Sequence, residues 1–166
     1  LGHVFASESR TAAPIRSAVV AAFRRAFAGK RTRLILQNPD DRALLLRLKV
    51  VDPSTVRLIR GAGVDTAEFA CFPEPEGMPL VVLPGRMLWD KGVPEFVRAA
   101  RCVRQTGVQA RFALVGASDP QNPACVPPEQ LAAWQDEGVV ECWGRRDDMP
   151  AVLRSCAVVC LPSYRE

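Results

Sequence analysis

Two cations and two glycines fall within one short segment, residues 85–92. An apolar run, residues 80–83, precedes it and a helical pattern begins at Val93, so the segment is predicted to be a strand-to-helix loop. Glycines let a backbone approach anionic oxygens, Arg86 offers a planar fork of donors, and Lys91 offers a mobile point charge. The N-terminus of the following helix adds partial positive charge. These residues predict a phosphate-binding loop, and a surface loop with two solvated cations fits them equally well.

The loop departs from two common phosphate-binding patterns. The chain contains neither the Gly-x-x-x-x-Gly-Lys-Ser/Thr order of NTPases nor the Gly-x-Gly-x-x-Gly dinucleotide pattern. Gly61 and Gly63 come nearest to the second pattern, but a third glycine and a following helix are missing. Tyr164 is the only tyrosine, so the Tyr-x-x-x-Lys pair of sugar-nucleotide epimerases is missing too. Both observations argue against an epimerase.

The cysteines do not form a metal-binding pattern. Cys156 and Cys160 have helix-like spacing, but no second pair follows them, and the only histidine, His3, is distant in sequence. We therefore expect no metal site. We expect all six cysteines to be buried free thiols, because most of them lie in apolar segments.

The first part of the chain is basic and begins with an amphipathic pattern. Apolar residues recur every four positions over residues 14–28, which predicts a helix. Residues 10–39 hold seven Arg and Lys and no acid, so the net charge of +4 leaves −3 for the rest of the chain. This local charge argues against a nucleic-acid binder and for one cationic surface. The helix fits an ordinary surface helix, or one that docks on anionic lipid headgroups.

Strands and helices are predicted to alternate along the whole chain. A short strand, a helix that begins at Arg42 behind an aspartate cap, and a second strand follow the basic helix. Residues 61–79 are rich in proline and glycine and predict an interdomain linker. After it, strands alternate with helices of about ten residues, which predicts an α/β fold whose parallel sheet is covered on both faces. The predicted strands are 33–37, 56–60, 80–83, 110–115, 139–143 and 157–161, and the later helices are 42–48, 93–105, 128–137 and 148–155.

Ligands of such sheets bind outside the carboxyl ends of the strands. The loops that begin at residues 84, 116, 144 and 162 are therefore predicted to meet at one edge. Asp119 and Asn122 are expected to shape the loop after Gly116 and are assigned no chemistry. The loops and their flanking elements contain several short motifs in a fixed order. These are Gly61-Ala62-Gly63-Val64-Asp65, the segment from Gly85 to Val93, Phe112-x-Leu114-Val115-Gly116, Gly144-x-x-Asp147-Asp148-Met149-Pro150, and Leu161-Pro162-Ser163-Tyr164-Arg165-Glu166.

The order and spacing of these motifs resemble the family-four, or group 1, retaining glycosyltransferases over nearly the whole chain. The resemblance implies the GT-B fold, in which two Rossmann-like domains of parallel sheet flanked by helices face each other. On that plan residues 1–60 are the last part of the N-terminal, acceptor-side domain, and 61–79 are the interdomain linker. Residues 80–166 are then the first half of the C-terminal nucleotide-sugar domain. Both domains are expected to be incomplete, so that this piece alone is inactive.

The resemblance also assigns roles to residues. Arg86 and Lys91, with Gly85, match the residues that contact the donor diphosphate, in agreement with the charge argument above. Gly116, Gly144 and Arg145 match positions that contact the nucleotide. Glu166 matches the first glutamate of the Glu, seven residues, Glu motif, the catalytic carboxylate that contacts the donor sugar or its ribose.

The expected function is transfer of a sugar, with retention, from a UDP- or GDP-sugar to a lipid-linked or polysaccharide acceptor in bacterial cell-surface glycan biosynthesis. The nucleotide sugar is the substrate, and neither a cofactor nor a metal is expected. The protein is expected to be cytoplasmic, with peripheral contact to the inner face of the cytoplasmic membrane through residues 14–33, and not to bind nucleic acid. The alternatives are a non-catalytic nucleotide-binding module and another doubly wound sugar-nucleotide enzyme.

Overall fold

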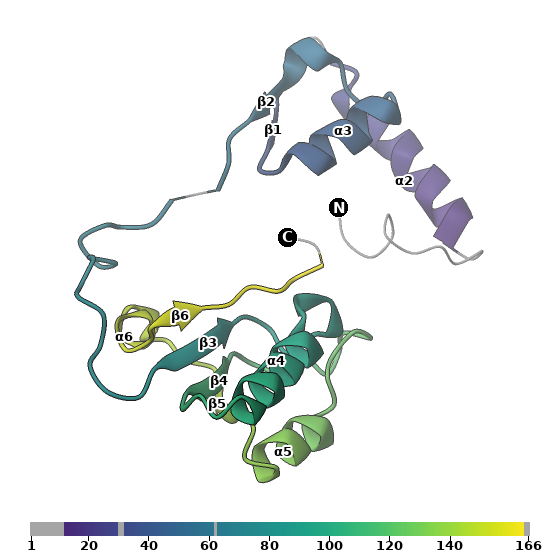
Figure 1. Ribbon diagram of the computed structural model, residues 1–166. Helices are drawn as coiled ribbons and strands as arrows, with labels where there is room; N and C mark the ends of the chain where they lie inside the picture. Colours follow the sequence, from purple (N-terminus) through teal and green to yellow (C-terminus); the bar gives the residue numbers. More distant parts are fainter. Residues whose placement is uncertain (1–11, 30–31, 62, 165–166) are drawn as a thin grey trace. The chain divides into compact units, whose positions relative to one another are not determined.

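The computed structural model describes residues 12–29, 32–61 and 63–164 (Figure 1). The chain divides into two compact units, Leu1–Val64 and Asp65–Glu166, and this division falls within the range 61–79 that was predicted as a linker. In each unit, parallel strands alternate with helices. The predicted α/β class with parallel sheets flanked by helices is thus confirmed.

The first unit contains a two-stranded parallel sheet. Leu34 of one strand pairs with Val56 of the other, and the helix between the strands contacts both. Leu45 on that helix is 2% exposed and lies in the small core with Val50 and Val56. The elements are α2 (Ala12–Phe27), β1 (Leu34–Leu36), α3 (Pro39–Arg47), the 3-10 turn η1 (Pro53–Thr55) and β2 (Val56–Leu58).

The predicted start of α3 was wrong by three residues. The helix begins at Pro39, not at Arg42, and its N-cap is Asn38, whose side chain accepts a hydrogen bond from the Asp41 amide at 2.7 Å. Asparagine caps a helix as well as aspartate does, and proline is favoured in the first turn because its missing N–H has no partner there. The two acids expected to precede the helix, Asp40 and Asp41, therefore lie in its first turn.

The predicted basic helix is confirmed as α2. Its apolar stripe is half-buried at Val19, Phe23 and Phe27, and the rings of Phe23 and Phe27 are 5.7 Å apart. Ile15, at the N-terminal end of the stripe, is 54% exposed. Arg24 Nη2 donates to the carbonyl of Leu48 at 2.7 Å, which ties α2 to the end of α3.

The second unit contains a four-stranded parallel sheet in the order β5-β4-β3-β6. Leu80 of β3 pairs with Arg111 of β4, and Val81 of β3 pairs with Val158 of β6. The elements are β3 (Leu80–Pro84), the 3-10 turn η2 (Trp89–Lys91), α4 (Val93–Gln105), β4 (Arg111–Val115), α5 (Pro128–Asp136), β5 (Glu141–Gly144), α6 (Met149–Arg154) and β6 (Val158–Val159).

Helices cover both faces of this sheet. Leu83 and Leu114 pack on one face with α4 and α5, where Phe96 stacks edge-on against Phe112. Val82 and Val115 point to the other face and pack with Val152 of α6. This alternation follows from the two-residue period of a strand. The edge strand β6 is less covered than expected, because Val158 and Val159 are 50% and 45% exposed.

Candidate functional site

The predicted phosphate loop lies at the carboxyl end of β3, as the parallel sheet requires. Gly85 continues the β3–β4 ladder by donating its N–H to the Val115 carbonyl at 2.9 Å. Beyond it the chain forms the turn η2, and Gly92 then caps α4 with φ of 73°, a left-handed conformation that glycine adopts without strain. The loop therefore presents its residues at a helix N-terminus, where backbone N–H groups favour anions.

A cavity of about 160 Å³ opens at this edge of the sheet, between the ends of β3 and β6. Lys91 is half-buried in its wall, beside Gly85. The structure thus brings two of the predicted diphosphate-binding residues together. The lining residues are Leu83, Pro84, Gly85, Lys91, Leu161 and Ser163.

Arg86, the third predicted diphosphate contact, has a side chain that is 60% exposed and forms an ion pair. Its Nη1 donates to Oδ2 of Asp119 at 3.1 Å. Asp119 comes from the loop after β4, so the pair joins the ends of neighbouring strands. This contact was not predicted.

The segment after β6 is fastened to the start of α4. Tyr164 donates its backbone N–H to the Asp90 carbonyl at 3.0 Å and its phenol O–H to Glu95 Oε1 at 2.8 Å. The phenol hydrogen bond lowers the pKa of Glu95, and the carboxylate raises the pKa of Tyr164. Pro162 fills the space next to Gly92, where an added Cβ would stand 2.3 Å from the Pro162 carbonyl oxygen.

The predicted catalytic residue, Glu166, lies outside the described residues. Its neighbours in the chain, Pro162 to Tyr164, are positioned by the contacts to Asp90, Gly92 and Glu95. Tyr164, two residues before Glu166, thus lies against the end of the predicted phosphate loop at Asp90.

The predicted nucleotide contacts lie at the ends of β4 and β5. Gly116 follows β4 and is in backbone contact with Gly85, whereas Gly144 ends β5 with φ of 65° and no atom within 4 Å of where a Cβ would stand. Arg145 is exposed and pairs with Asp147 at 3.1 Å. Gly116 therefore adjoins the phosphate loop directly, whereas Gly144 and Arg145 lie at the same edge with β4 between their strand and β3.

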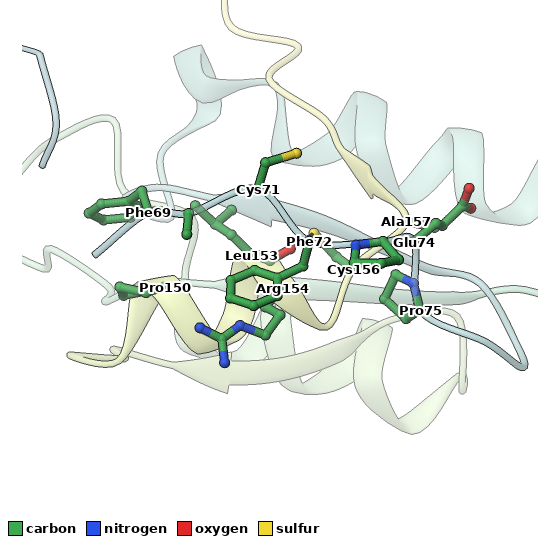
Figure 2. A pocket seen from close by; sticks show the side chains of 12 residues that line it. Phe69, Cys71, Phe72, Glu74, Pro75, Pro150, Leu153, Arg154, Cys156 and Ala157 are labelled. Carbon is green, nitrogen blue, oxygen red and sulfur yellow. Dashed lines mark hydrogen bonds between the residues drawn. The ribbon is translucent and has the colours of Figure 1, made fainter. Parts of the chain in front are cut away.

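Another cavity, of about 370 Å³, shares no lining residue with the cavity beside Lys91 (Figure 2). Residues 69–75 and α6 line it, and the Arg154 guanidinium carbon lies 3.8 Å from the centroid of the Phe72 ring. Because that cation already stacks on the ring, it is engaged in packing residues 69–75 against α6. The smaller cavity is the one that Lys91 and the N-terminus of α4 adjoin.

The cysteines are free but less buried than expected. Cys71 and Cys102 are exposed, and the other four are half-buried. The prediction of buried thiols was wrong because apolar neighbours in sequence do not place every residue of a helix or loop inside. Partial burial raises the pKa of Cys142 and of Cys156. Within residues 12–29, 32–61 and 63–164, no group of three or more His, Cys, Asp or Glu could hold a metal ion.

Two contacts at this edge were missed by sequence reasoning. Asp119 was predicted only to shape its loop. A carboxylate in the loop after the strand next to β3 is the signal that could have identified it as a partner of Arg86. The Tyr164 to Glu95 hydrogen bond joins residues that are 69 positions apart. No local pattern marks such a pair.

The described helices include none that is long and apolar enough to cross a membrane.

Comparison with known proteins places the second unit in a sequence family. The family model described as "Glycosyl transferases group 1" matches residues 78–166. An N,N'-diacetylbacillosaminyl-diphospho-undecaprenol alpha-1,3-N-acetylgalactosaminyltransferase from Campylobacter jejuni is 39% identical over 88 residues, which are 53% of this chain and 21% of that protein. The chain thus spans about a fifth of the length of this curated relative.

Solved structures resemble the fold of both units. The glycosyltransferase WaaG, involved in lipopolysaccharide biosynthesis, superposes with a TM-score of 0.65 at 19% identity, covering 88% of this chain and 42% of its own. Sucrose-phosphate synthase from Thermosynechococcus elongatus has a TM-score of 0.68 at 22% identity, and the match covers 100% of this chain and 41% of the synthase chain. An Anabaena protein in complex with UDP has a TM-score of 0.63 at 18% identity, and the match covers 81% of this chain and 39% of the Anabaena chain. These likenesses show a GT-B fold, of which the chain spans about two fifths.

Proposed function

Because the chain belongs to the group 1 glycosyl transferases, whose family model covers residues 78–166, we propose that the whole protein is a retaining glycosyltransferase. It moves a sugar from a UDP- or GDP-sugar to a lipid-linked or polysaccharide acceptor in cell-surface glycan biosynthesis. The bond between the anomeric carbon and the diphosphate oxygen breaks, and the acceptor hydroxyl oxygen takes the sugar. The nucleoside diphosphate and a proton are released.

One observation supports this proposal above the others. The loop of residues 85–92 holds Lys91 beside a cavity at the carboxyl end of β3 and places Arg86 in the same strand-to-helix connection, before the N-terminus of α4. Two cations and a helix N-terminus provide the donors and the positive charge that a diphosphate needs. We propose that Arg86, Lys91 and Gly85 bind the donor diphosphate.

The same cations would assist catalysis as well as binding. Negative charge builds up on the diphosphate as the glycosidic bond breaks, so fixed positive charge stabilises the transition state more than the ground state. Because Arg86 and Lys91 supply that charge, we propose that no metal ion is required. UDP binding that is unchanged by a chelator is the expected result. Glu166 completes the proposal as the carboxylate that accepts hydrogen bonds from the donor sugar, and Gly116, Gly144 and Arg145 contact the nucleotide.

The test of the donor site is the double variant Arg86→Ala/Lys91→Ala in the full-length protein. Loss of two charge-assisted contacts should weaken UDP or GDP binding by about a hundredfold in calorimetry and reduce turnover with it. The matched control is Arg101→Ala/Arg104→Ala, which removes the same charge from the other end of α4. Circular dichroism checks that both variants fold. Equal nucleotide affinity in the two variants would refute the assignment.

The acceptor part of the proposal is supported by the Campylobacter relative, whose name describes transfer of N-acetylgalactosamine to a sugar on undecaprenol diphosphate. We propose transfer of a hexosyl or N-acetylhexosaminyl group to an acceptor of that lipid-linked class. A panel of UDP- and GDP-sugars, assayed with the full-length protein and a polyprenyl diphosphate sugar acceptor, tests this choice. Turnover only with an acceptor that lacks a lipid would contradict it.

A lipid-linked acceptor implies contact with a membrane surface, and we propose that residues 14–33 provide it at the inner face of the cytoplasmic membrane. The segment has no acid, α2 has Arg24 and Arg25 in its last turn, and Ile15 is exposed. Basic residues beside exposed apolar ones favour anionic lipid headgroups.

The variant Arg25→Glu tests the membrane contact, because Arg25 is exposed, whereas Arg24 is avoided because it ties α2 to Leu48. Binding to vesicles of anionic phospholipid should fall by at least about tenfold, since reversing a charge near the surface removes an attraction of about 1 kcal/mol and adds a repulsion of similar size. Arg47→Glu on α3, which also reverses one exposed charge, is the control with the same change in charge. An equal loss in both variants would mean that only net charge matters.

A further inference from the structure

The loop after β4 runs along the predicted phosphate loop and is hydrogen-bonded to it. Met87 donates its N–H to Ala117 at 3.1 Å and accepts from Val126 at 2.9 Å, and Trp89 donates to Ala124 at 2.9 Å. The bonds to Ala124 and Val126 place residues 124–126 antiparallel to residues 87–89, as the bridge between Leu88 and Cys125 also shows, and Ala117 contacts Met87 from the start of the same loop. The two loops therefore form one unit at the edge of the sheet.

Asn122 holds the conformation of this second loop. Its side-chain oxygen accepts from the Ala124 N–H at 2.9 Å, its own N–H donates to the Asp119 carbonyl at 2.8 Å, and its carbonyl accepts from Cys125 at 2.9 Å. Asn122 is half-buried, and the three bonds fix the backbone on both sides of it. The Asp119 carboxylate is thereby presented from a fixed backbone.

That carboxylate contacts Arg86 through one oxygen and one nitrogen. Asp119 Oδ2 lies 3.1 Å from Arg86 Nη1, and the two side chains are 35% and 60% exposed. A guanidinium has five N–H donors, so a single contact at one nitrogen leaves the rest of the fork for an anion. Such an exposed ion pair contributes little to folding stability. The ion pair instead orients the Arg86 side chain, which is long and has many rotamers.

We propose that Asp119 is a positioning residue that orients Arg86 toward the donor diphosphate, with Asn122 holding Asp119 in place. The inference rests on the proposed function of Arg86. An arginine that is ordered before the donor arrives loses less conformational freedom on binding, so the donor binds more tightly. Asp119 remains on the guanidinium in the complex and does not touch the donor.

The experiment is calorimetry of UDP and GDP binding to Asp119→Ala, Asp119→Asn and Arg86→Ala, and to Asp119→Ala/Arg86→Ala. Asp119→Ala should weaken nucleotide binding about tenfold, the effect of one side chain that is no longer ordered. Asp119→Asn keeps an acceptor for Arg86 and should bind within about twofold of the wild type, or more tightly because an anion is removed. In the Arg86→Ala background, Asp119→Ala should have no further effect.

Glu137→Ala is the matched control. Glu137 Oε1 accepts from Arg101 Nε at 2.7 Å in an exposed ion pair, and this pair lies at the other end of α4 from the phosphate loop. It should leave nucleotide binding unchanged. Tighter binding by both Asp119 variants would show that Asp119 competes with the diphosphate, and would overturn the proposal. A further loss in the double variant would overturn it as well, because Asp119 would then act on the loop and not on Arg86. Unchanged binding by Arg86→Ala itself would instead refute the proposed donor site.

Discussion

Gly116 approaches Gly85 so closely that a Cβ on Gly116 would stand 1.7 Å from the Gly85 carbonyl oxygen. The contact arises where β3 and β4 end side by side, because Gly85 donates to the Val115 carbonyl and the ladder then stops. A side chain at Gly116 would push the phosphate loop away from the loop that holds Asp119. Glycine is thus required at position 116 by close approach of two backbones.

We expect Gly116→Ala to destabilise the protein by about 3 kcal/mol or more, since a backbone atom cannot move aside as a flexible side chain can. Denaturant unfolding measures this change. The control is Gly107→Ala, where φ is 81° but no atom lies within 4 Å of the added Cβ. The free energy of unfolding of that variant should fall by only about 1–2 kcal/mol, because alanine is strained in a left-handed backbone conformation. Equal losses in the two variants would show that the close approach is not rigid.

The Arg86 fork gives a second prediction. Arg86→Lys keeps the positive charge but loses the planar set of donors, and an ammonium cannot contact Asp119 and a phosphate in the same geometry. We expect UDP or GDP affinity to fall about tenfold in calorimetry, the effect of about one charge-assisted hydrogen bond. Affinity equal to that of the wild type would show that position 86 needs only a point charge.

The fold was largely predictable because its helices have a strong local signal. Helix α4 spans Val93–Gln105, as predicted, since a clear apolar face and Gly92 and Gly107 at its ends mark its limits. The start of α3 was missed because Asn38, Asp40 and Asp41 are all acceptable caps, and sequence alone did not choose among them. Boundaries depend on one hydrogen bond, whereas the existence of a helix depends on many residues.

The candidate site was predictable only in part. Topology brings the carboxyl ends of parallel strands together, so the place of Arg86 and Lys91 followed from their position after a strand. The partners of the loop did not follow. Asp119 meets Arg86, and Tyr164 meets Glu95, through the particular course of irregular segments, for which sequence shows no periodicity. Roles assigned to single residues therefore stay predictions until binding is measured.

The core behind α4 gives a third prediction. Phe96 is 1% exposed and stacks on Phe112 with ring centroids 5.6 Å apart. Phe96→Ala should lower the free energy of unfolding by about 3–5 kcal/mol, because it leaves a cavity under the helix that presents the phosphate loop. Phe72→Ala is the control, since Phe72 is 47% exposed and stacks on Arg154, and its loss should cost about 1 kcal/mol. Similar losses would mean that the Phe96 site collapses on truncation.

The hydrogen bond between Tyr164 and Glu95 predicts a pH window. The pKa of Glu95 is lowered, so its contribution to stability is present above its ordinary value of 4.5 and is lost as the pH falls through the folded value. The pKa of Tyr164 is raised, so its contribution is present below its ordinary value of 10.0 and is lost as the pH rises through the folded value. The segment after β6 should therefore stay fastened to α4 between these limits.

Ultraviolet titration measures this directly in the 166-residue chain, because Tyr164 is its only tyrosine. The phenol should ionise above its ordinary pKa in the wild type. In Glu95→Gln the pKa of Tyr164 should fall toward the ordinary value, because the negative charge that opposes phenolate formation is gone. Glu137→Gln should leave the pKa of Tyr164 unchanged, and Tyr164→Phe should abolish the signal. An ordinary phenol pKa in the wild type, with circular dichroism showing a folded chain, would mean that Tyr164 does not hold Glu95 in solution.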